Sequence, residues 1–241
     1  MRGVILAGGT GTRLGKLTKV TNKHLLPVGH EPMIGHGIRK LVGSGIKDIT
    51  LVTNPESVGD FARLLGSGED FLCNITYRVQ NKPGGIAEAL GLVKAYCDTR
   101  LCAVLLGDNI FQSKIPRVII DGMIAPNHAC IVLKQVPDPS RYGVVEFDRE
   151  MIVGIEEKPT HPKSEYAITG IYRYPSDIFD VIKSLKPSAR GELEITDVNN
   201  YYLKNHRISY SMLDGYWTDA GTTESLQLAN DLVYRQPPRF S

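Results

Sequence analysis

The feature that most constrains this chain is the segment at residues 3–14, which reads GVILAGGTGTRL. Its apolar, β-branched start is too short for a globular helix and leads directly into glycines and hydroxyls, as where a buried parallel strand ends in a ligand-binding loop. Glycines let backbone N–H groups converge on an anion, while Thr10, Thr12 and Arg13 add hydroxyl and guanidinium donors suited to phosphate oxygens. The sequence therefore predicts a phosphate-binding loop.

Two better-known glycine loops do not fit this segment. The P-loop requires G-x-x-x-x-G-K-S/T, and neither Gly-Lys-Ser nor Gly-Lys-Thr occurs in the chain. The dinucleotide fingerprint G-x-G-x-x-G is met at Gly9 and Gly11, but Leu14 occupies its third glycine position. A strand-to-helix turn without a ligand is the remaining alternative, and it does not explain three glycines, two threonines and an arginine within residues 8–13.

The composition of the chain limits the kinds of partner that we expect it to bind. The net charge of +2 gives no electrostatic footprint for nucleic acid, so any anion site must use locally placed groups such as Arg13 and Lys23. No apolar run reaches membrane-spanning length. The four cysteines form no C-x-x-C pair and have no nearby histidine at zinc spacing. We therefore expect no nucleic-acid or membrane partner, reduced buried thiols and a cytoplasmic location.

Strand and helix signals alternate through the first half of the sequence. Strand candidates at 49–53, 75–79 and 101–106, the last the most apolar, are separated by segments with helical periodicity. This alternation predicts an α/β, Rossmann-like fold with a mostly parallel central sheet flanked by helices. Beyond residue 128, four strand candidates with little helix between them predict a smaller β-rich extension, at 130–136, 144–147, 152–156 and 167–174.

At 241 residues the chain is long enough for one large α/β domain, and it contains no linker, internal repeat or low-complexity segment. We expect a single domain at 1–241, with a first half at about 1–127 and a second half at about 128–232. Pro237 and Pro238 predict a frayed tail at 233–241.

Two charged residues of the first half are candidates for a phosphate site. Asp108 follows the strand at 101–106, and the carboxyl ends of parallel strands line the ligand crevice. A carboxylate beside phosphates needs a cation between them, usually Mg²⁺; the alternative is a turn that caps the next helix. Lys23 follows the glycine loop and is either a second phosphate cation or a solvated lysine.

Two charged clusters of the second half also have a structural alternative. Glu157 and Lys158 close a predicted strand and place both signs of charge at the mouth of a loop, which is equally typical of an exposed ion pair. Trp217, the single tryptophan, stands two residues before Asp219, which also fits a helix cap with an anchored aromatic ring. These residues alone leave both interpretations open.

Taken in order, these segments resemble the sugar-1-phosphate nucleotidyltransferases, and within that family the members that use dTTP and glucose 1-phosphate. The resemblance runs from Arg2 to about Leu232. Its motifs are LAGGTGTRL at 6–14, NKHLLPV at 22–28, LGDN at 106–109, RYGVVEF at 141–147, EEKP at 156–159, ARGELEITD at 189–197 and WTDAGT at 217–222.

The resemblance implies a nucleotide-binding first half and a sugar-phosphate-binding second half. The nucleotide would contact Leu6, Gly8, Gly9, Thr10, Gly11, Arg13, Gln80, Gly85 and Asp108. The sugar phosphate would contact Tyr142, Gly143, Glu157, Lys158, Thr169 and Trp217. The catalytic cations would be Arg13, Lys23 and Lys158, and the Mg²⁺ ligands would be Asp108 and Asp219.

The implied reaction is in-line attack of a sugar phosphate oxygen on the α-phosphorus of dTTP, which gives dTDP-glucose and pyrophosphate. The nucleophile is already mostly ionised at neutral pH, so no general base is needed. A UTP-using relative remains an alternative, because uracil and thymine differ by one methyl group. A non-catalytic sugar-nucleotide sensor is a second alternative, and it predicts loss of a metal carboxylate or phosphate cation. We also expect a homo-oligomer.

The sequence departs from the family pattern in three places. Lys16 stands where a proline is usual, and Glu88 stands where Gln or Asp is more usual. Longer members carry a C-terminal helical extension used for subunit contacts and a regulatory nucleotide site. We expect this chain to be a short form without that extension.

Overall fold

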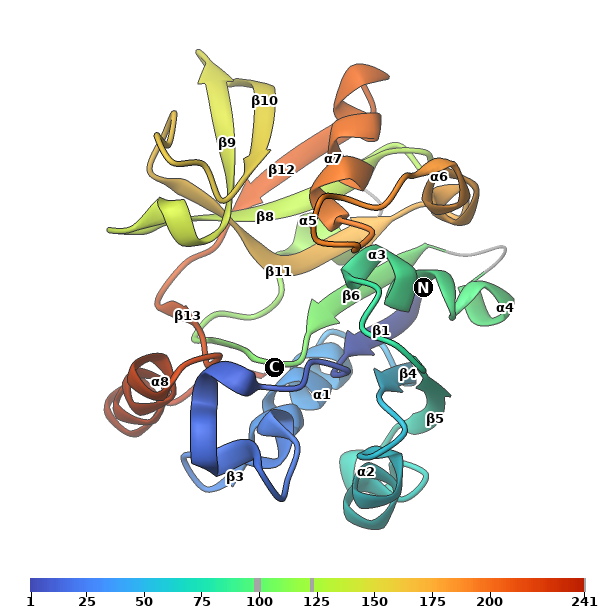
Figure 1. Ribbon diagram of the computed structural model, residues 1–241, viewed down its shortest axis with the longest axis vertical. Helices are drawn as coiled ribbons and strands as arrows, with labels where there is room; N and C mark the ends of the chain where they lie inside the picture. The colour runs from blue at the N-terminus through green and yellow to red at the C-terminus, as the bar shows by residue number, and fades with distance from the viewer. Residues whose placement is uncertain (98–100, 122–123, 241) are drawn as a thin grey trace.

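The computed structural model describes residues 1–97, 101–121 and 124–240 (Figure 1). Four parallel strands form the first half of its central sheet, in the spatial order β6 (Cys102–Leu106), β1 (Arg2–Leu6), β4 (Asp48–Thr53) and β5 (Asn74–Val79). In this register Val4 lies between Thr50 and Val104. The strands predicted for the first half are confirmed to within one residue at each end.

Helices cover both faces of the parallel strands, as their continuous apolar runs require. Side chains alternate along β1, so Val4 and Leu6 pack into one core and Ile5 into the other. The first core receives α3 (Ile86–Gly91), α4 (Lys94–Cys97), α6 (Ile178–Ser184) and α7 (Ile195–Lys204). The second receives α1 (Met33–Gly43), α2 (Val58–Leu65) and α5 (Arg117–Ile120).

The second half of the chain continues the same sheet. Its strands are β8 (Ala129–Gln135), β9 (Gly143–Asp148), β10 (Met151–Glu157), β11 (Tyr166–Tyr174) and β12 (Ile208–Met212), so this sheet has nine strands within the described residues. β11 is antiparallel to β6, β8 and β9, whereas β12 is parallel to β8. Figure 1 shows these strands, mostly yellow to orange, above the blue and green parallel half. The predicted Rossmann-like α/β fold with a β-rich extension is therefore confirmed.

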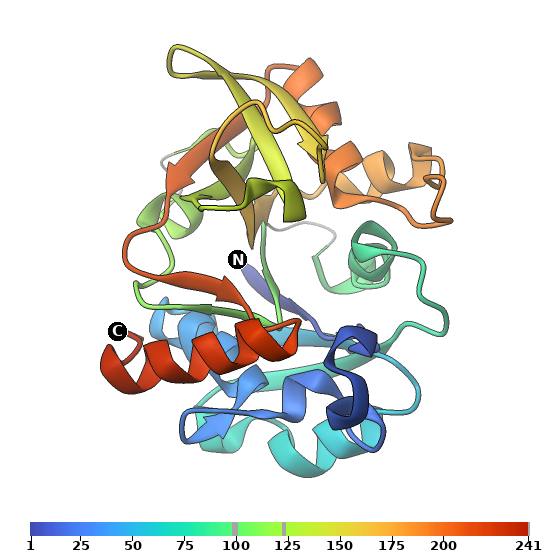
Figure 2. The same cartoon turned by 60° about the vertical axis from the view of Figure 1, so that its left-hand side comes forward.

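The chain finally returns to the first half. β13 (Trp217–Asp219) pairs antiparallel with β7 (Asn109–Phe111). α8 (Thr223–Arg235), red in Figure 2, then packs beside the hairpin of β2 (Pro27–Val28) and β3 (Glu31–Pro32). The side chain of Thr222 caps α8 by accepting a 3.2 Å hydrogen bond from the backbone N of Ser225. This pairing places β13 beside β7, which begins at the residue that follows Asp108.

The prediction of a frayed tail at 233–241 is wrong for residues 233–240. Val233 is buried in α8, and the backbone N of Arg239 donates to the carbonyl of Gln112 at 2.7 Å. The carbonyl of Arg239 accepts from Nζ of Lys40 at 2.7 Å. The two prolines end the helix, but the chain beyond them is bound by distant polar groups. Residue 241 lies outside the described residues.

Two further predictions concern the whole chain. All four cysteines lie in described segments and are buried, as predicted, and the structure contains no disulfide among them. Across the described ranges, no helix combines the length and the apolar character needed to cross a bilayer.

Candidate active site

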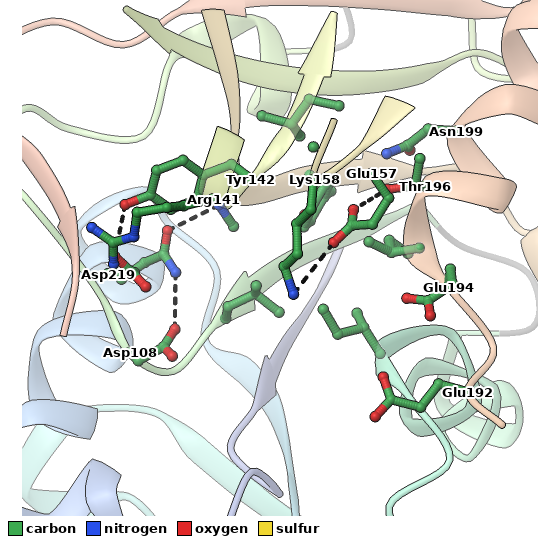
Figure 3. A pocket seen from close by; sticks show the side chains of 18 of the residues that line it. Asp108, Arg141, Tyr142, Glu157, Lys158, Glu192, Glu194, Thr196, Asn199 and Asp219 are labelled. Carbon is green, nitrogen blue, oxygen red and sulfur yellow. Dashed lines mark hydrogen bonds and ion pairs between the residues drawn. The ribbon is translucent and has the colours of Figure 1, made fainter. Parts of the chain in front are cut away.

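Two adjoining pockets open at the carboxyl ends of the parallel strands. The loop pocket is lined by Leu6, Gly8, Gly9, Thr10, Lys23, His24, Gln80, Pro83, Gly85, Ile86, Ala89, Leu106, Asp108 and Glu192. The sheet pocket, seen in Figure 3, is lined by Arg13, Ile86, Leu106, Asp108, Asn109, Arg141, Tyr142, Gly143, Glu157, Lys158, Ile168, Gly170, Tyr172, Arg190, Glu192, Glu194, Ile195, Thr196, Asn199, Trp217 and Asp219. Both include Asp108, so ligands bound in the two pockets would meet beside this carboxylate.

The glycine loop makes a tight turn at Gly11. This residue has φ of +68°, and its carbonyl accepts 2.9 Å hydrogen bonds from the backbone N of Leu14 and from Oγ1 of Thr18. A Cβ atom at Gly11 would lie 2.9 Å from Cγ2 of Thr18, so both the conformation and the space favour glycine. The turn leaves residues 8–10 lining the loop pocket, whereas Gly11 itself does not line it.

A buried ion pair lies at the junction of the pockets. Nζ of Lys23 contacts Oδ2 of Asp108, and both side chains are largely shielded from solvent. Burial alone would raise the pKa of Asp108, but the charges of Lys23 and His24, together with the hydrogen bonds from Lys23 and Asn109, hold that pKa well below its usual range. Burial, followed by the charge of Lys23, lowers the pKa of His24 to about 3. Around neutral pH, therefore, the carboxylate of Asp108 is ionised beside a neutral imidazole of His24.

Asn109 connects Asp108 to the second half of the molecule. Its Nδ2 donates to Oδ1 of Asp108 at 3.0 Å. Its Oδ1 accepts from the backbone N of Gly170 at 2.9 Å and from Nε1 of Trp217 at 2.6 Å. Because Asn109 is 5% exposed, these bonds fix its amide and join β7, β11 and β13 directly beside the candidate site.

Asp219 lies opposite Asn109 in the β7–β13 ribbon. Its Oδ1 accepts a 2.9 Å hydrogen bond from the hydroxyl of Tyr142 and lies 3.4 Å from Nη2 of Arg141 (Figure 3). Burial, followed by the negative charge of Asp108, raises the pKa of Asp219. The two aspartates therefore interact as like charges, an arrangement that a divalent cation would relieve. This pair is the candidate metal-binding group of the site.

Arg13 reaches the sheet pocket from the glycine loop. A Cβ atom at Gly221 would lie 3.0 Å from Nη2 of Arg13 and 3.4 Å from Oδ2 of Asp219. The guanidinium therefore lies on the same side of Gly221 as the carboxylate, where it helps to lower the pKa of Asp219 against the larger effects of burial and Asp108.

Lys158 enters the sheet pocket immediately after β10. Its φ of +47° is unusual for a residue other than glycine, and its backbone N donates to the carbonyl of Tyr142 at 2.9 Å. Its Nζ lies 3.8 Å from Oε1 of Glu157, whose Oε2 accepts from Oγ1 of Thr196 at 2.6 Å (Figure 3). The Lys158 side chain is 49% exposed, so its ammonium group can reach a ligand.

The wall of the loop pocket at Gly85 is tied to the second half of the chain. Gly85 has φ of +95°, and a Cβ atom there would lie 2.5 Å from the carbonyl oxygen of Leu193. The backbone of Leu193 also donates to the carbonyl of Gly84 at 2.8 Å and accepts from the N of Ala87 at 3.2 Å. These contacts hold the wall of one pocket against the segment that lines the other.

The structure brings all but three of the candidate site residues to these pockets. The exceptions are Gly11, Thr12 and Thr169. Thr169 is fully buried, and its Oγ1 donates to the carbonyl of Val132 at 2.9 Å. Its neighbours Ile168 and Gly170 line the sheet pocket instead, where the pairing of β11 with β8 is irregular. Thr169 itself lines neither pocket, so its contact with the sugar phosphate stays a prediction.

Sequence reasoning also missed several lining residues. These are His24, Asn109, Arg141, Arg190, Glu192, Glu194, Thr196 and Asn199. The signal was present, because Arg141 opens the motif RYGVVEF and four of the others lie in ARGELEITD. Those motifs indicate the family, but a local motif does not reveal which of its charged residues line a pocket.

The α/β fold and the two adjoining pockets are typical of a transferase that binds two substrates side by side, here next to Asp108 and Asp219. A family model described as Nucleotidyl transferase matches residues 2–236, and the chain belongs to this family. A glucose-1-phosphate thymidylyltransferase of Neisseria meningitidis serogroup A is 44% identical over 237 residues, covering 97% of this chain and 82% of the relative.

Two solved structures also resemble the chain. A Bacillus anthracis protein provisionally assigned as a glucose-1-phosphate thymidylyltransferase, crystallised with sucrose, is 53% identical with a TM-score of 0.92 over 96% of this chain and 94% of its own. A UDP-glucose pyrophosphorylase in complex with UDP-glucose has a TM-score of 0.83 over 97% of this chain and 98% of its own. Its identity is 23%, so this second likeness shows a shared fold alone.

Proposed function

We propose that this chain transfers the thymidylyl group of dTTP to glucose 1-phosphate, giving dTDP-glucose and pyrophosphate. The observation that carries the proposal is the meeting of two pockets at one ion pair, with Asp108 in both and Lys23 beside it. The likeness to thymidylyltransferases over nearly the whole chain supports the choice of substrates.

The nucleotide is proposed to bind in the loop pocket, with its triphosphate along residues 8–10 and its base toward Gln80 and Gly85. Glucose 1-phosphate is proposed to bind in the sheet pocket, with its phosphate near Lys158 and its hydroxyls near Glu157. The hydrogen bond from Thr196 fixes one oxygen of Glu157 and leaves the other facing Lys158, which supports a defined sugar orientation.

The two aspartates fit a Mg²⁺ site. The ion prefers hard oxygen ligands and is usually held by one or two carboxylates together with substrate phosphates. The raised pKa of Asp219, caused by burial and then by Asp108, indicates a like-charge contact without full internal compensation. Asp108 and Asp219 would hold the ion, which supplies positive charge to the phosphate oxygens when bound.

The proposed chemistry needs positioning and charge neutralisation from the protein. An oxygen of the sugar phosphate attacks the α-phosphorus of dTTP, the bond to the oxygen bridging to the β-phosphorus breaks, and pyrophosphate leaves. Lys158 orients the attacking phosphate, while Arg13 and Lys23 hold the nucleotide phosphates against it. Because the nucleophile is already ionised at neutral pH, no side chain has to remove a proton.

Pyrophosphate release with a matrix of nucleotides and sugar 1-phosphates tests the proposal. We expect Mg²⁺-dependent release with dTTP and glucose 1-phosphate, and loss of it in Asp219→Asn. Faster turnover with UTP than with dTTP would show that the chain is a uridylyltransferase and not a thymidylyltransferase. Tight binding of a sugar nucleotide without turnover on any sugar phosphate would replace it by a sensor.

We further propose that the enzyme works in the cytoplasm as a homo-oligomer, with small molecules rather than nucleic acid or membrane as its ligands. The buried thiols without disulfides support a reducing compartment. Light scattering of the purified chain tests the oligomeric state, and a monomer across the working concentration range would contradict that part of the proposal.

A further inference from the structure

Gln80 is held in one amide orientation where it lines the loop pocket. Its Nε2 donates to the carbonyl of Gly85 at 3.2 Å and to Oε2 of Glu88 at 2.5 Å. A primary amide nitrogen has two hydrogens, so these bonds occupy both. Its Oε1 lies 3.1 Å from the position that a Cβ atom of Gly8 would take. Gln80 therefore offers the pocket an acceptor and no donor.

Glu88 is positioned for this contact by a glycine. A Cβ atom at Gly84 would overlap Oε2 of Glu88 and lie 2.5 Å from its Cδ, so the carboxylate packs directly over Gly84. An ionised carboxylate only accepts hydrogen bonds. It attracts Nε2 of Gln80 and would repel Oε1, as would the carbonyl of Gly85. Rotating the amide of Gln80 by half a turn would therefore lose two hydrogen bonds and set oxygen against oxygen.

We propose that Glu88 is a positioning residue that selects the nucleobase by fixing the amide of Gln80. Thymine and uracil carry a ring imide N–H that can donate to Oε1 of Gln80. Cytosine carries an unprotonated ring nitrogen at the same place, which would set two acceptors against each other. The inference rests on the proposed function for the identity of the nucleotide. It also implies that Glu88 does not separate dTTP from UTP, since both bases have the imide N–H.

Without the Glu88 carboxylate, the Gln80 amide loses one of the two contacts that fix it and can turn its N–H groups toward cytosine. We expect Glu88→Ala to reduce the ratio of kcat/KM for dTTP over dCTP by about tenfold, mainly through KM. Glu88→Gln should have a smaller effect, because an amide at position 88 can still accept from Gln80. Gly84→Ala should act like Glu88→Ala, since it displaces the same carboxylate without removing it.

The controls distinguish a loss of nucleobase selectivity from a general loss of folding or substrate binding. The ratio of kcat/KM for dTTP over UTP and the KM for glucose 1-phosphate should stay unchanged in all three variants, and thermal unfolding should show that each is folded. If kcat/KM falls by the same factor for dTTP, UTP and dCTP, Glu88 has a structural role only and the inference is overturned.

Calorimetric binding of dTTP, UTP and dCTP keeps this test independent of turnover. If no sugar 1-phosphate supports pyrophosphate release, the proposed function fails, while the ratio of nucleotide affinities still reports on Glu88. If the unaltered protein turns over but binds dTTP and dCTP equally, the inference fails and the proposed function stands.

Discussion

The hydroxyl of Tyr142 donates a 2.9 Å hydrogen bond to Oδ1 of Asp219, the carboxylate whose pKa is raised by burial and by the charge of Asp108. This bond stabilises the ionised carboxylate and so works against the upward shift. The pKa of Asp219, a proposed metal ligand, thus depends on Tyr142 and Asp108, so three separate segments of the chain contribute to it.

We predict that Tyr142→Phe moves the acidic limb of the activity profile to higher pH. Ionised Asp219 is the form that can bind Mg²⁺, so activity is lost as pH falls through its raised pKa. Removing the hydroxyl takes away a stabilising bond to the ionised form and raises that pKa further. The measurement is kcat/KM against pH at fixed, limiting Mg²⁺.

A second tyrosine–aspartate pair provides the matched control. Tyr202 donates to Oδ1 of Asp177 at 2.8 Å, and neither residue lines the two pockets. Tyr202→Phe should leave the acidic limb where it is. An identical shift of the acidic limb in both variants would mean that the pH profile of kcat/KM reports the folding of the protein and not the ionisation of Asp219.

We also predict that Asp108→Asn and Asp219→Asn both remove most turnover but change stability in opposite directions. Asp108→Asn leaves the ammonium of Lys23, 10% exposed, without its counter-charge, which should cost about 3 kcal/mol. Asp219→Asn removes a buried charge repelled by Asp108, and should raise Tm near neutral pH. Pyrophosphate release and thermal unfolding measure the two effects.

The signs follow from the directions of the two pKa shifts. The folded pKa of Asp108 is depressed, so its stabilising contribution is present at neutral pH and is lost as pH falls through that pKa. The folded pKa of Asp219 is raised, so its contribution is lost as pH rises through that pKa. Near-normal turnover of either variant at limiting Mg²⁺ would exclude that residue as a metal ligand.

A third prediction concerns the C-terminal tail. Ending the chain at Pro238 removes the Arg239 carbonyl that accepts from Lys40 at 2.7 Å and the Phe240 ring that lies 5.1 Å from the same ammonium. Lys40 is 1% exposed and would keep only the carbonyls of Gln112 and Ser113 as acceptors. We expect a loss of about 1–3 kcal/mol in the free energy of unfolding and unchanged KM values.

Gly43→Ala tests the same contact from the other side. A Cβ atom there would overlap the carbonyl of Phe240, so the tail could not lie in its observed place. The variant should lose about as much stability as the truncation, and combining the two should add little. Full additivity would show that the tail and Gly43 stabilise the fold independently.

The local parts of the site could be predicted from the sequence, and the long-range parts could not. The glycine loop and Asp108 follow strands whose apolar runs are visible without any tertiary information. The Asn109 amide, by contrast, binds residues 61 and 108 positions away, and no local pattern predicts such pairs. Thr169 alternates along β11 with Ile168 and Gly170, which line the pocket, and the face that each residue of a strand presents depends on how the strand is placed in the sheet.

The tail illustrates a different limit. Two prolines and polar neighbours correctly mark the end of a helix, but Lys40 binds the tail through a backbone carbonyl, which carries no sequence signature. A buried lysine whose amino group donates to carbonyls of distant segments can therefore order a stretch whose own composition predicts disorder.

The last prediction concerns Lys158, for which the sequence left a catalytic cation and an exposed ion pair equally open. In the structure its Nζ lies 3.8 Å from Oε1 of Glu157 and its side chain lines the sheet pocket, so both roles fit its position. If Lys158 binds the phosphate of glucose 1-phosphate, Lys158→Ala removes a charge-assisted hydrogen bond of about 1.5–3 kcal/mol. We expect kcat/KM for glucose 1-phosphate to fall about ten- to a hundredfold, with the KM for dTTP nearly unchanged.

Lys163 supplies the matched control for this variant, since its Nζ lies 3.4 Å from Oε1 of Glu146 and it lines neither pocket. Lys163→Ala should cost less than about 1 kcal/mol of stability and leave both substrates unaffected, as expected for an exposed pair. Steady-state kinetics with each substrate varied in turn separates the two lysines. If Lys158→Ala behaves like Lys163→Ala, with an unchanged kcat/KM for glucose 1-phosphate, then Lys158 is an exposed ion-pair partner and does not contact the substrate.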